Sequence, residues 1–164
     1  MTQRLSRTFN RHLSRSERAS DRKWKNRVRH IADLTPADLG SASALWDQAG
    51  LTRPWNPPEL DLLRALAGET STVLGLFDGK ILVGTVMVGH DGHRGWVYYL
   101  AVDDTHRGTG LGRRLMVAAE DWLRERGVVK LQLMVRSANA AVLSFYDRLG
   151  YEDADVQVRA KWLR

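Results

Sequence analysis

A glycine-rich passage between a predicted strand and a predicted helix constrains this chain more than any other feature of its sequence. Residues 106–114 are HRGTGLGRR, so three glycines alternate with Thr109 and Leu111. Glycine allows a turn to adopt left-handed backbone conformations, and the first N–H groups of the following helix carry partial positive charge. Together with the neighbouring arginines, the passage predicts a site for phosphate or diphosphate. The sequence leaves open that the glycines serve only a tight strand-to-helix turn.

Two familiar phosphate-binding motifs do not fit this passage. A Walker A loop has Lys and then Ser or Thr after its last glycine, whereas Gly112 is followed by Arg113 and Arg114. A Rossmann fingerprint has a glycine at its sixth position and an acidic residue after the next strand, whereas this chain has Leu115 and Arg136 there. The predicted anion site therefore belongs to neither class.

Hydrophobic periodicity and turn residues predict alternating strands and helices in residues 27–164. Asp78 and Gly79 separate two β-rich segments, which predicts a tight hairpin. The strand–helix–strand order of residues 96–135 predicts a parallel pair of strands with a right-handed crossover. The fold class is therefore α/β (α+β), with helices covering a mixed sheet. The predicted strands are 27–31, 72–77, 80–89, 96–102, 130–135 and 155–163, and the predicted helices are 36–49, 59–67, 112–126 and 139–149.

The basic character of the chain comes from its N-terminal segment. Residues 1–29 contain ten lysines and arginines against two acidic residues, whereas residues 30–164 contain fifteen against seventeen. The net charge of +6 therefore says little about what the larger part of the chain binds. We expect residues 1–26 to form a poorly ordered basic extension, with residues 27–164 as the folded domain. The alternatives for the extension are contact with nucleic acid or an acidic partner, and an organelle transit peptide.

Composition excludes several classes of protein. The length of 164 residues suits one domain, and a hydrophobic content of 43% favours a buried core. The absence of cysteine excludes a disulfide scaffold, a thiolate metal site and a cysteine nucleophile, and we expect no metal. No apolar run approaches the length of a membrane-spanning helix, and the N-terminus lacks the apolar region of a secretory signal. We therefore expect a cytoplasmic protein with no membrane partner.

Two motifs carry a resemblance to a known family. The first, RGTGLG at residues 107–112, follows a predicted strand that ends in LAV at 100–102. The second, NAAVLSFYDRLGY, spans residues 139–151. In both motifs and in their spacing the chain resembles the GNAT acetyltransferase superfamily, and it is similar to a subgroup of small bacterial single-domain members. The resemblance covers residues 27–164. It implies the acyl-CoA N-acyltransferase fold, in which a mixed, mostly antiparallel central sheet contains a bulged, splayed parallel pair and helices flank both faces.

The resemblance implies an enzyme that moves an acetyl group from acetyl-CoA to a primary amine by direct attack. In the family pattern, Tyr146 is the general acid that protonates the departing thiolate. The backbones of Leu100 and Val102 are expected to bind the pantetheine arm, the glycine loop the pyrophosphate, and Asn139 the pantetheine region. The residues expected to bind acetyl-CoA are Leu100, Val102, Arg107, Gly108, Thr109, Gly110, Leu111, Gly112, Arg113, Asn139 and Tyr146.

The sequence does not identify the acceptor, which is expected to be an amine-bearing small molecule or a protein or peptide. Trp46, Trp55 and Tyr98 are candidates for the walls of an aromatic acceptor pocket, because loops on a rigid scaffold carry recognition. Trp46 fits a buried helix face equally well. Many family members place Glu or His at positions matching Trp96 or Tyr98, so no general base is assigned. The sequence leaves a homodimer open.

Two other functions fit the same residues. The missing base leaves open a non-catalytic CoA-binding sensor or regulatory module, which would bind the cofactor without turnover. The basic extension leaves open a protein associated with nucleic acid or the ribosome. Binding of that kind would fall steeply with ionic strength and would require residues 1–24.

Overall fold

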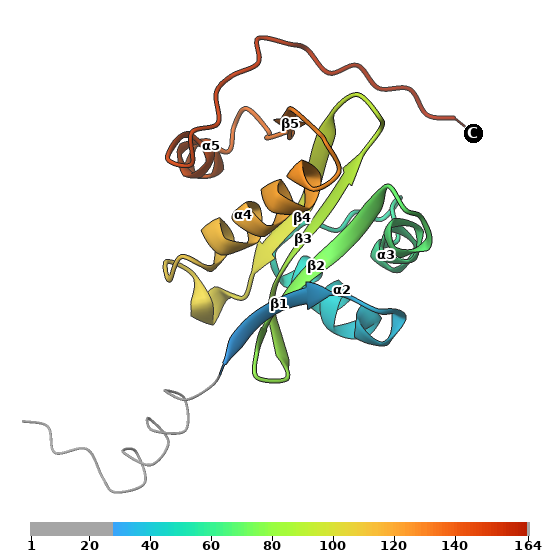
Figure 1. The fold of residues 1–164 in the computed structure, drawn as a ribbon, viewed down its shortest axis with the longest axis vertical. Helices are drawn as coiled ribbons and strands as arrows, with labels where there is room; N and C mark the ends of the chain where they lie inside the picture. The colour runs from blue at the N-terminus through green and yellow to red at the C-terminus, as the bar shows by residue number, and fades with distance from the viewer. Residues whose placement is uncertain (1–27, 164) are drawn as a thin grey trace, which may run out of the picture.

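Residues 28–163, the part of the chain that the computed structural model describes, form a sheet of five strands with helices on both faces (Figure 1). The strands lie in the order β1 to β5, and every neighbouring pair is antiparallel except β4 and β5, which are parallel. The predicted mixed, mostly antiparallel sheet is therefore confirmed. The predicted extension at 1–26 lies outside the described residues. None of the helices in residues 28–163 has the length and apolar character that crossing a membrane requires.

Local sequence explains where the elements begin. The backbone N–H and the hydroxyl of Thr35 both donate to the Asp38 carboxylate at 2.8 Å, which caps the first helical segment. Gly79 has φ 64°, the left-handed conformation that the predicted Asp-Gly hairpin requires. Most predicted boundaries agree with the structure to within two residues. The elements are β1 Arg29–Asp33, η1 Pro36–Asp38, α2 Leu39–Gln48, α3 Pro58–Ala67, β2 Ser71–Asp78, β3 Ile81–His90, β4 Gly95–Val102, η2 Asp104–His106, α4 Leu111–Arg124, β5 Leu131–Gln132 and α5 Ala140–Asp147.

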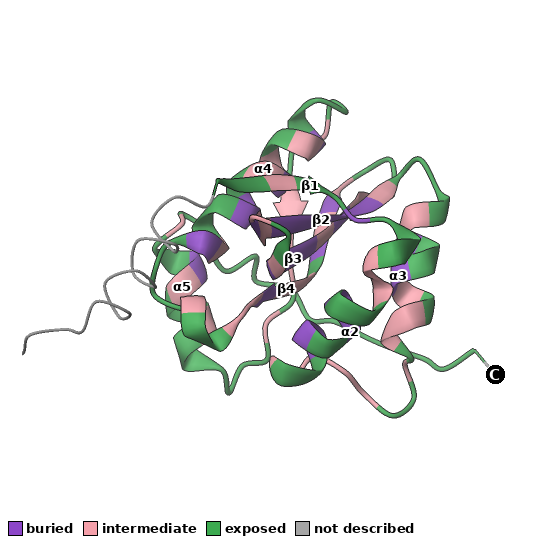
Figure 2. Ribbon diagram, turned by 90° about the horizontal axis from the view of Figure 1, so that it is seen from below, coloured by how far each residue is buried: buried purple, intermediate pink, exposed green. Residues whose placement is uncertain are grey.

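Two hydrophobic cores cover the two faces of the sheet. On one face, α4 buries Leu115 and Met116 against the central strands, and α5 adds partly buried residues at the edge. On the other face, Trp46 of α2 and Leu62 of α3 are buried against the same strands. Figure 2 shows the buried residues gathered on the sheet and on the inward sides of these helices. A side chain of a central strand therefore faces either α4 or the α2–α3 pair.

An extra residue in β4 changes the face to which its side chains point. The register between β3 and β4 shifts between Thr85 and Met87, and Tyr99 of β4 has φ 50°. These two features define a β-bulge. Beyond the bulge, Leu100 packs toward the α4 core, whereas Tyr98 lines a pocket beside α3. The bulge that the family resemblance implies is therefore present.

The sequence predicts a longer β5 and a final strand, and the structure contradicts both. β5 pairs with β4 only through Leu131 and Gln132, rather than over the predicted 130–135. No strand forms within the described part of 155–163, where Val156 is 67% exposed. An alternating apolar pattern produces a strand only where a neighbouring strand offers an edge. A two-residue β5 offers no edge of the necessary length.

We expect Gly95→Ala to lower the free energy of unfolding by about 1–3 kcal/mol, through overpacking. A Cβ at Gly95 would lie 2.5 Å and 2.8 Å from the two methyl carbons of Leu123, and Leu123 is itself 2% exposed. The backbone N–H of Gly95 also donates to the Lys130 carbonyl at 2.9 Å, so β4 cannot shift away without losing that bond. Urea denaturation measures the effect. Gly40→Ala is the matched control, because a Cβ there meets no atom within 4 Å. Equal stability of the two variants contradicts the prediction.

Candidate active site

The glycine-rich loop leaves unobstructed backbone between β4 and α4. Gly108 and Gly110 have left-handed conformations, with φ 72° and 83°, and a Cβ at either position would meet no atom within 4 Å. Gly110 immediately precedes α4, whose first N–H groups have no acceptor within the helix. Helix N–H groups beside open glycines are an arrangement that binds diphosphate.

Two side chains of the loop serve its own structure. The Thr109 hydroxyl donates to the His106 carbonyl at 2.6 Å and closes the turn. The Leu111 side chain is 2% exposed and belongs to the α4 core. Only the backbone of Leu111 is therefore placed to face a ligand.

Polar contacts of Asp103, His106 and Asp78 connect the start of the loop to the sheet. The Asp103 carboxylate accepts from the backbone N–H of Thr105 at 2.9 Å, and a ring nitrogen of His106 lies 3.2 Å away. Hydrogen bonds from Thr105 and His106 lower the pKa of Asp103. The other ring nitrogen of His106 lies 3.7 Å from the Asp78 carboxylate, which is buried at the end of β2 and lies 3.5 Å from Arg29.

The arginines of the loop are exposed. Arg107 pairs with Asp104 at 2.8 Å, but its side chain is 60% exposed. Exposed pairs contribute only about 0–1 kcal/mol, so Arg107 can turn to an anion at little cost. Arg113 is also exposed, and the guanidinium of Arg114 donates to the Arg29 carbonyl at 3.4 Å.

Phe145 of α5 lies against the first turn of α4, which brings the two sequence motifs together. A Cβ on Gly112 would lie 3.3 Å from Cζ of Phe145, so the missing side chain at Gly112 permits this close approach. The side-chain oxygen of Asn139 accepts from the backbone N–H of Val142 at 3.3 Å and caps α5. Tyr146 follows Phe145 in α5, and its side chain belongs to the core that α4 forms with the sheet.

Tyr146 is largely buried, with 9% of its surface exposed. Its ring lies edge-on to Phe145 and to Tyr151, at centroid distances of 5.0 Å and 5.5 Å. Burial raises the pKa of Tyr146 to about 12. The phenol therefore keeps its proton at neutral pH and can donate it to a leaving group.

The half of β4 nearest the loop has no parallel neighbour within the described residues. The ladder with β5 involves only Gly95 and Trp96, whereas β4 continues to Val102. The side chains of Leu100 and Val102 pack toward the α4 core. The backbone of such an unpaired edge can bind an extended ligand as a further strand would bind.

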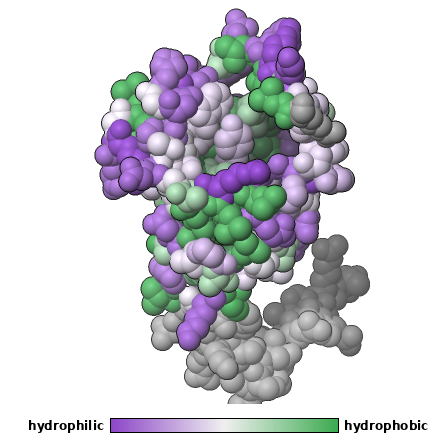
Figure 3. Space-filling view, turned by 90° about the vertical axis from the view of Figure 1, so that its right-hand side faces the viewer, coloured by the Kyte–Doolittle hydropathy of each residue, from purple (hydrophilic) through white to green (hydrophobic). Residues whose placement is uncertain are grey.

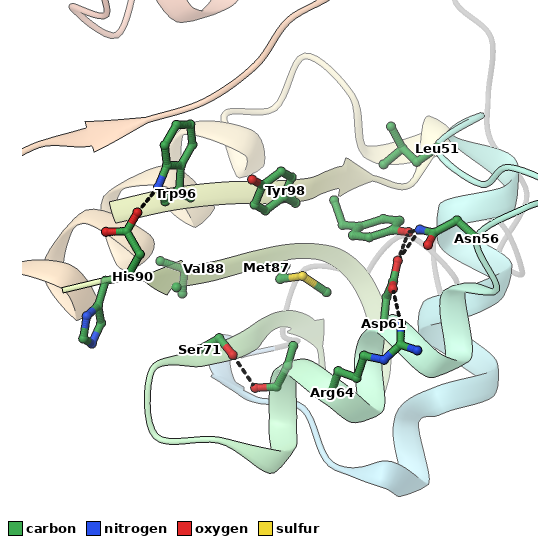
Figure 4. A pocket seen from close by; sticks show the side chains of 14 residues that line it. Leu51, Asn56, Asp61, Arg64, Ser71, Met87, Val88, His90, Trp96 and Tyr98 are labelled. Carbon is green, nitrogen blue, oxygen red and sulfur yellow. Dashed lines mark hydrogen bonds and ion pairs between the residues drawn. The ribbon is translucent and has the colours of Figure 1, made fainter. Parts of the chain in front are cut away.

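A pocket of about 720 Å³ lies on the opposite face of the sheet, between α3 and the adjoining parts of β3 and β4. Its size falls within the about 300–1,000 Å³ of small-molecule sites. Figure 4 shows Tyr98 and Met87 near its middle, Asp61 at one end and Trp96 at the other. The indole N–H of Trp96 donates to Asp91 at 3.1 Å. Figure 3 shows this face hollowed, with hydrophobic surface at depth and hydrophilic side chains around the rim.

The pKa values of two ionisable groups of the pocket are shifted. Backbone N–H groups of Arg94 and His93 lower the pKa of Asp91 to about 2, and the bond from Trp96 contributes further. Burial raises the pKa of Tyr98, and the charge of Asp91 adds to the shift. At neutral pH the pocket therefore contains an ionised carboxylate and a protonated phenol.

A model of the Acetyltransferase (GNAT) family matches residues 41–151, which include the loop, the unpaired half of β4 and Tyr146. The chain belongs to this family. As a member of this family, the protein is an acyltransferase, which moves an acetyl group from acetyl-CoA to an amine.

Solved structures of other acetyltransferases share the fold of this one. The ribosomal-protein-S18-alanine N-acetyltransferase from Escherichia coli is 28% identical, with TM-score 0.68 over 77% of this chain and 79% of that chain. The aminoglycoside N-acetyltransferase AAC(6')-Iy, solved in complex with CoA, is 14% identical, with TM-score 0.73 over 84% of this chain and 96% of that chain. An acetyltransferase from Trypanosoma brucei is 21% identical, with TM-score 0.65 over 82% and 100%.

Of the three residues predicted to form the walls of an acceptor pocket, Tyr98 alone lines the pocket between α3, β3 and β4. Trp46 is fully buried and its indole N–H donates to Thr85 at 2.8 Å, so the prediction of a pocket wall at Trp46 is wrong. The apolar face of α2 that contains Trp46 packs against the core. Trp55 is 56% exposed in the loop before α3 and lies edge-on to Trp162, and it is not one of the residues that line the pocket. A role for Trp55 in acceptor binding stays a prediction.

Sequence analysis did not select Asp61 and Asn56, which line the pocket of the acetyltransferase. Asp61 faces the pocket because α3 buries Leu62 and Ala65, which sets its neighbours on the flank of the helix. A helical projection anchored on the apolar stripe of α3 would have placed Asp61 at this border. Nothing in the sequence marks Asn56, since its position depends on the path of the preceding loop.

Proposed function

We propose that this acetyltransferase acetylates a primary amine that enters through the pocket between α3, β3 and β4, with Tyr146 as the general acid. The close contact between Gly112 and Phe145 is the observation that supports this most directly. Phe145 packs against the first turn of α4, and we take the next residue, Tyr146, as the proton donor to a thioester bound there. Direct attack by the amine requires no nucleophile from the protein.

The loop and the strand edge fit acetyl-CoA, which supplies an acetyl group activated as a thioester. Backbone N–H groups of residues 108–113 hold the diphosphate, and the exposed Arg107 and Arg113 add charge-assisted hydrogen bonds. The backbones of Leu100 and Val102 bind the pantetheine arm along the unpaired edge of β4.

Tyr146 acts on the leaving group. As the nitrogen–carbon bond of the amide forms and the carbon–sulfur bond breaks, the phenol of Tyr146 donates its proton to the departing sulfur. Because the oxygen of the Asn139 side chain caps α5, its NH₂ group is the part that reaches the pantetheine arm. An ammonium acceptor first loses one proton to solvent, which frees the nitrogen lone pair for attack. The proton lost as the amide forms also passes to solvent, and solvent returns a proton to the Tyr146 phenolate.

The acceptor pocket favours a cationic amine and holds its charge near the entrance. Asp91 is too weak a base to accept a proton at neutral pH, since its pKa is about 2. As an ionised carboxylate it instead attracts an ammonium group. Tyr98 of β4 lines the same pocket as this carboxylate and Asp61.

A thiol-release assay with acetyl-CoA over a panel of amines tests the proposed function. The panel includes polyamines, aminoglycosides, amino acids and peptides with free N-termini or lysines. We expect turnover with at least one cationic primary amine. Calorimetric binding of CoA without thiol release for any amine would indicate a CoA-binding module instead, and no heat on CoA titration would contradict the site as a whole.

The dependence of kcat on pH is a separate prediction. An ordinary tyrosine ionises near pH 10, but burial raises the pKa of Tyr146 to about 12. A raised pKa keeps the proton-donating form populated to higher pH, so kcat is expected to show no loss from phenol ionisation up to pH 10. Measurement of kcat from pH 6 to pH 10 with a saturating acceptor checks this. A decline that begins near pH 8.5, in protein that circular dichroism shows to be folded, contradicts the raised pKa of Tyr146.

A further inference from the structure

Tyr99 has an unusual backbone conformation in the middle of the site. Its φ is 50°, and among residues 28–163 the one other non-glycine residue with positive φ is Asp155. A bulky side chain rarely adopts this conformation, because its Cβ approaches the following carbonyl oxygen. Such a residue persists where its surroundings hold it in place.

Contacts from three elements and a loop hold Tyr99. Its ring stacks on Trp46 of α2, with 4.1 Å between ring centroids. Its phenol donates to the Asp61 carboxylate of α3 at 2.7 Å and accepts from the Asn56 amide at 3.1 Å. Figure 4 shows the Asn56 and Asp61 side chains close together at one end of the pocket. Its carbonyl accepts from the hydroxyl of Thr85 on β3 at 3.0 Å.

Thr85 connects two of these elements through a single oxygen. It is fully buried, and its hydroxyl accepts from the Trp46 indole at 2.8 Å while donating to the Tyr99 carbonyl. A hydroxyl has one proton and two lone pairs, so it can do both at once. At a bulge the hydrogen-bond ladder is interrupted, and a buried carbonyl there needs another donor.

We propose that Thr85 is a positioning residue for acetyl transfer and acts through Tyr99. By satisfying the carbonyl at the bulge, it fixes the conformation that turns Tyr98 into the acceptor pocket. The same bulge lies next to Leu100, on the edge assigned to pantetheine. This inference rests on the proposed function, because the bulge is inferred to align the acceptor amine with the thioester.

A merely structural role for Thr85 makes a different prediction. The side chains of β4 beyond the bulge pack into both cores, and this packing by itself favours the bulged register. If packing alone held the bulge, loss of the Thr85 hydroxyl would lower stability and leave turnover unchanged at temperatures where the protein is folded.

Thr85→Val tests the proposal, since it removes both hydrogen bonds and keeps a branched side chain. We expect kcat/KM for acetyl-CoA to fall about 10- to 100-fold, as misplacement of reacting groups by about 1 Å does. We expect Thr85→Ser, which keeps the hydroxyl, to retain activity within about threefold. Thr72→Val is the matched control. Thr72 is also buried in the sheet, but its hydroxyl donates to Asp33 at 2.6 Å and not to β4. We expect that control to lose stability and to keep its kcat/KM.

Hydrogen exchange without acetyl-CoA gives a readout independent of activity. In Thr85→Val, amides of residues 97–102 are expected to exchange at least about tenfold faster, because local opening becomes easier. The same amides are expected to keep their rates in Thr72→Val. Unchanged exchange at 97–102, or full activity in folded Thr85→Val, overturns the proposal.

Two further outcomes are also decisive. If Thr85→Val does not fold, Thr85→Ala replaces it, since that change also removes the bonds to the Trp46 indole and to the Tyr99 carbonyl. Faster exchange at 97–102 with reduced kcat/KM then supports the proposal, and wild-type values of both overturn it. If the wild-type protein acetylates no amine, the proposed function is wrong, and the exchange experiment still decides whether Thr85 holds the bulge.

Discussion

Replacing Tyr146 with phenylalanine is expected to lower kcat by about 100-fold or more, within the range for loss of a general acid. The affinity for CoA is expected to stay within about twofold, because the diphosphate and pantetheine sites lie on the loop and on β4. The physical reason is the loss of a proton donor, which burial keeps protonated by raising the pKa of Tyr146 to about 12. The phenol stays protonated at neutral pH, whereas phenylalanine offers no proton to the departing sulfur.

The fold should tolerate this substitution. Phenylalanine keeps the ring that lies edge-on to Phe145 and Tyr151. Tyr151→Phe is the matched control, because its phenol lies nearby but donates to Glu120 of α4 at 2.9 Å. That control is expected to lose about 1 kcal/mol of stability, as for a single hydrogen bond, and to keep its kcat. Steady-state kinetics and CoA calorimetry on both variants measure the contrast. Wild-type turnover in Tyr146→Phe would remove Tyr146 as the general acid.

Replacing Gly110 with glutamate is expected to weaken CoA binding by at least about 100-fold, which corresponds to about 2.7 kcal/mol. Two effects combine. Gly110 has φ 83°, a conformation that costs a residue with a side chain about 1–2 kcal/mol. The carboxylate also stands at the N-terminus of α4, where it occupies the open space at Gly110 and repels a diphosphate.

Two controls separate strain from charge. Gly110→Lys has the same strain with the opposite charge, so it is expected to bind CoA more tightly than Gly110→Glu. Gly127→Glu carries the same substitution to the far end of α4, where φ is 71° and a Cβ also meets open space. We expect it to lower stability without changing CoA affinity. Calorimetry that finds equal losses for Gly110→Glu and Gly127→Glu would show that the loop is not the diphosphate site.

Conformations that depend on one or two residues could be predicted from the sequence. The hairpin at Asp78 and Gly79 and the start of helical structure after Thr35 follow from backbone preferences and local hydrogen bonds. The glycine loop belongs to the same group, since Gly108 and Gly110 adopt the left-handed conformations that the motif predicts. The family follows from the motifs for the same reason, because a motif records local chemistry at fixed spacing.

Contacts between distant segments needed the tertiary structure. The alternating residues of 155–163 suit a strand, yet a strand exists only where another edge pairs with it, and β5 is too short to do so. The periodicity that places Trp46 on a helix face does not say whether that face meets the core or a ligand, and here it meets Thr85.

The sequence by itself determined the local turns, most of the helices and strands, and the family. Only the tertiary structure decided which side chains meet around Tyr99, because Asp61 and Thr85 reach it through the docking of α3 and the register of β3. Neither of these two contacts depends on the residues next to Asp61 and Thr85 in the sequence. Both follow from how two cores pack against one sheet, which is a property of the whole domain.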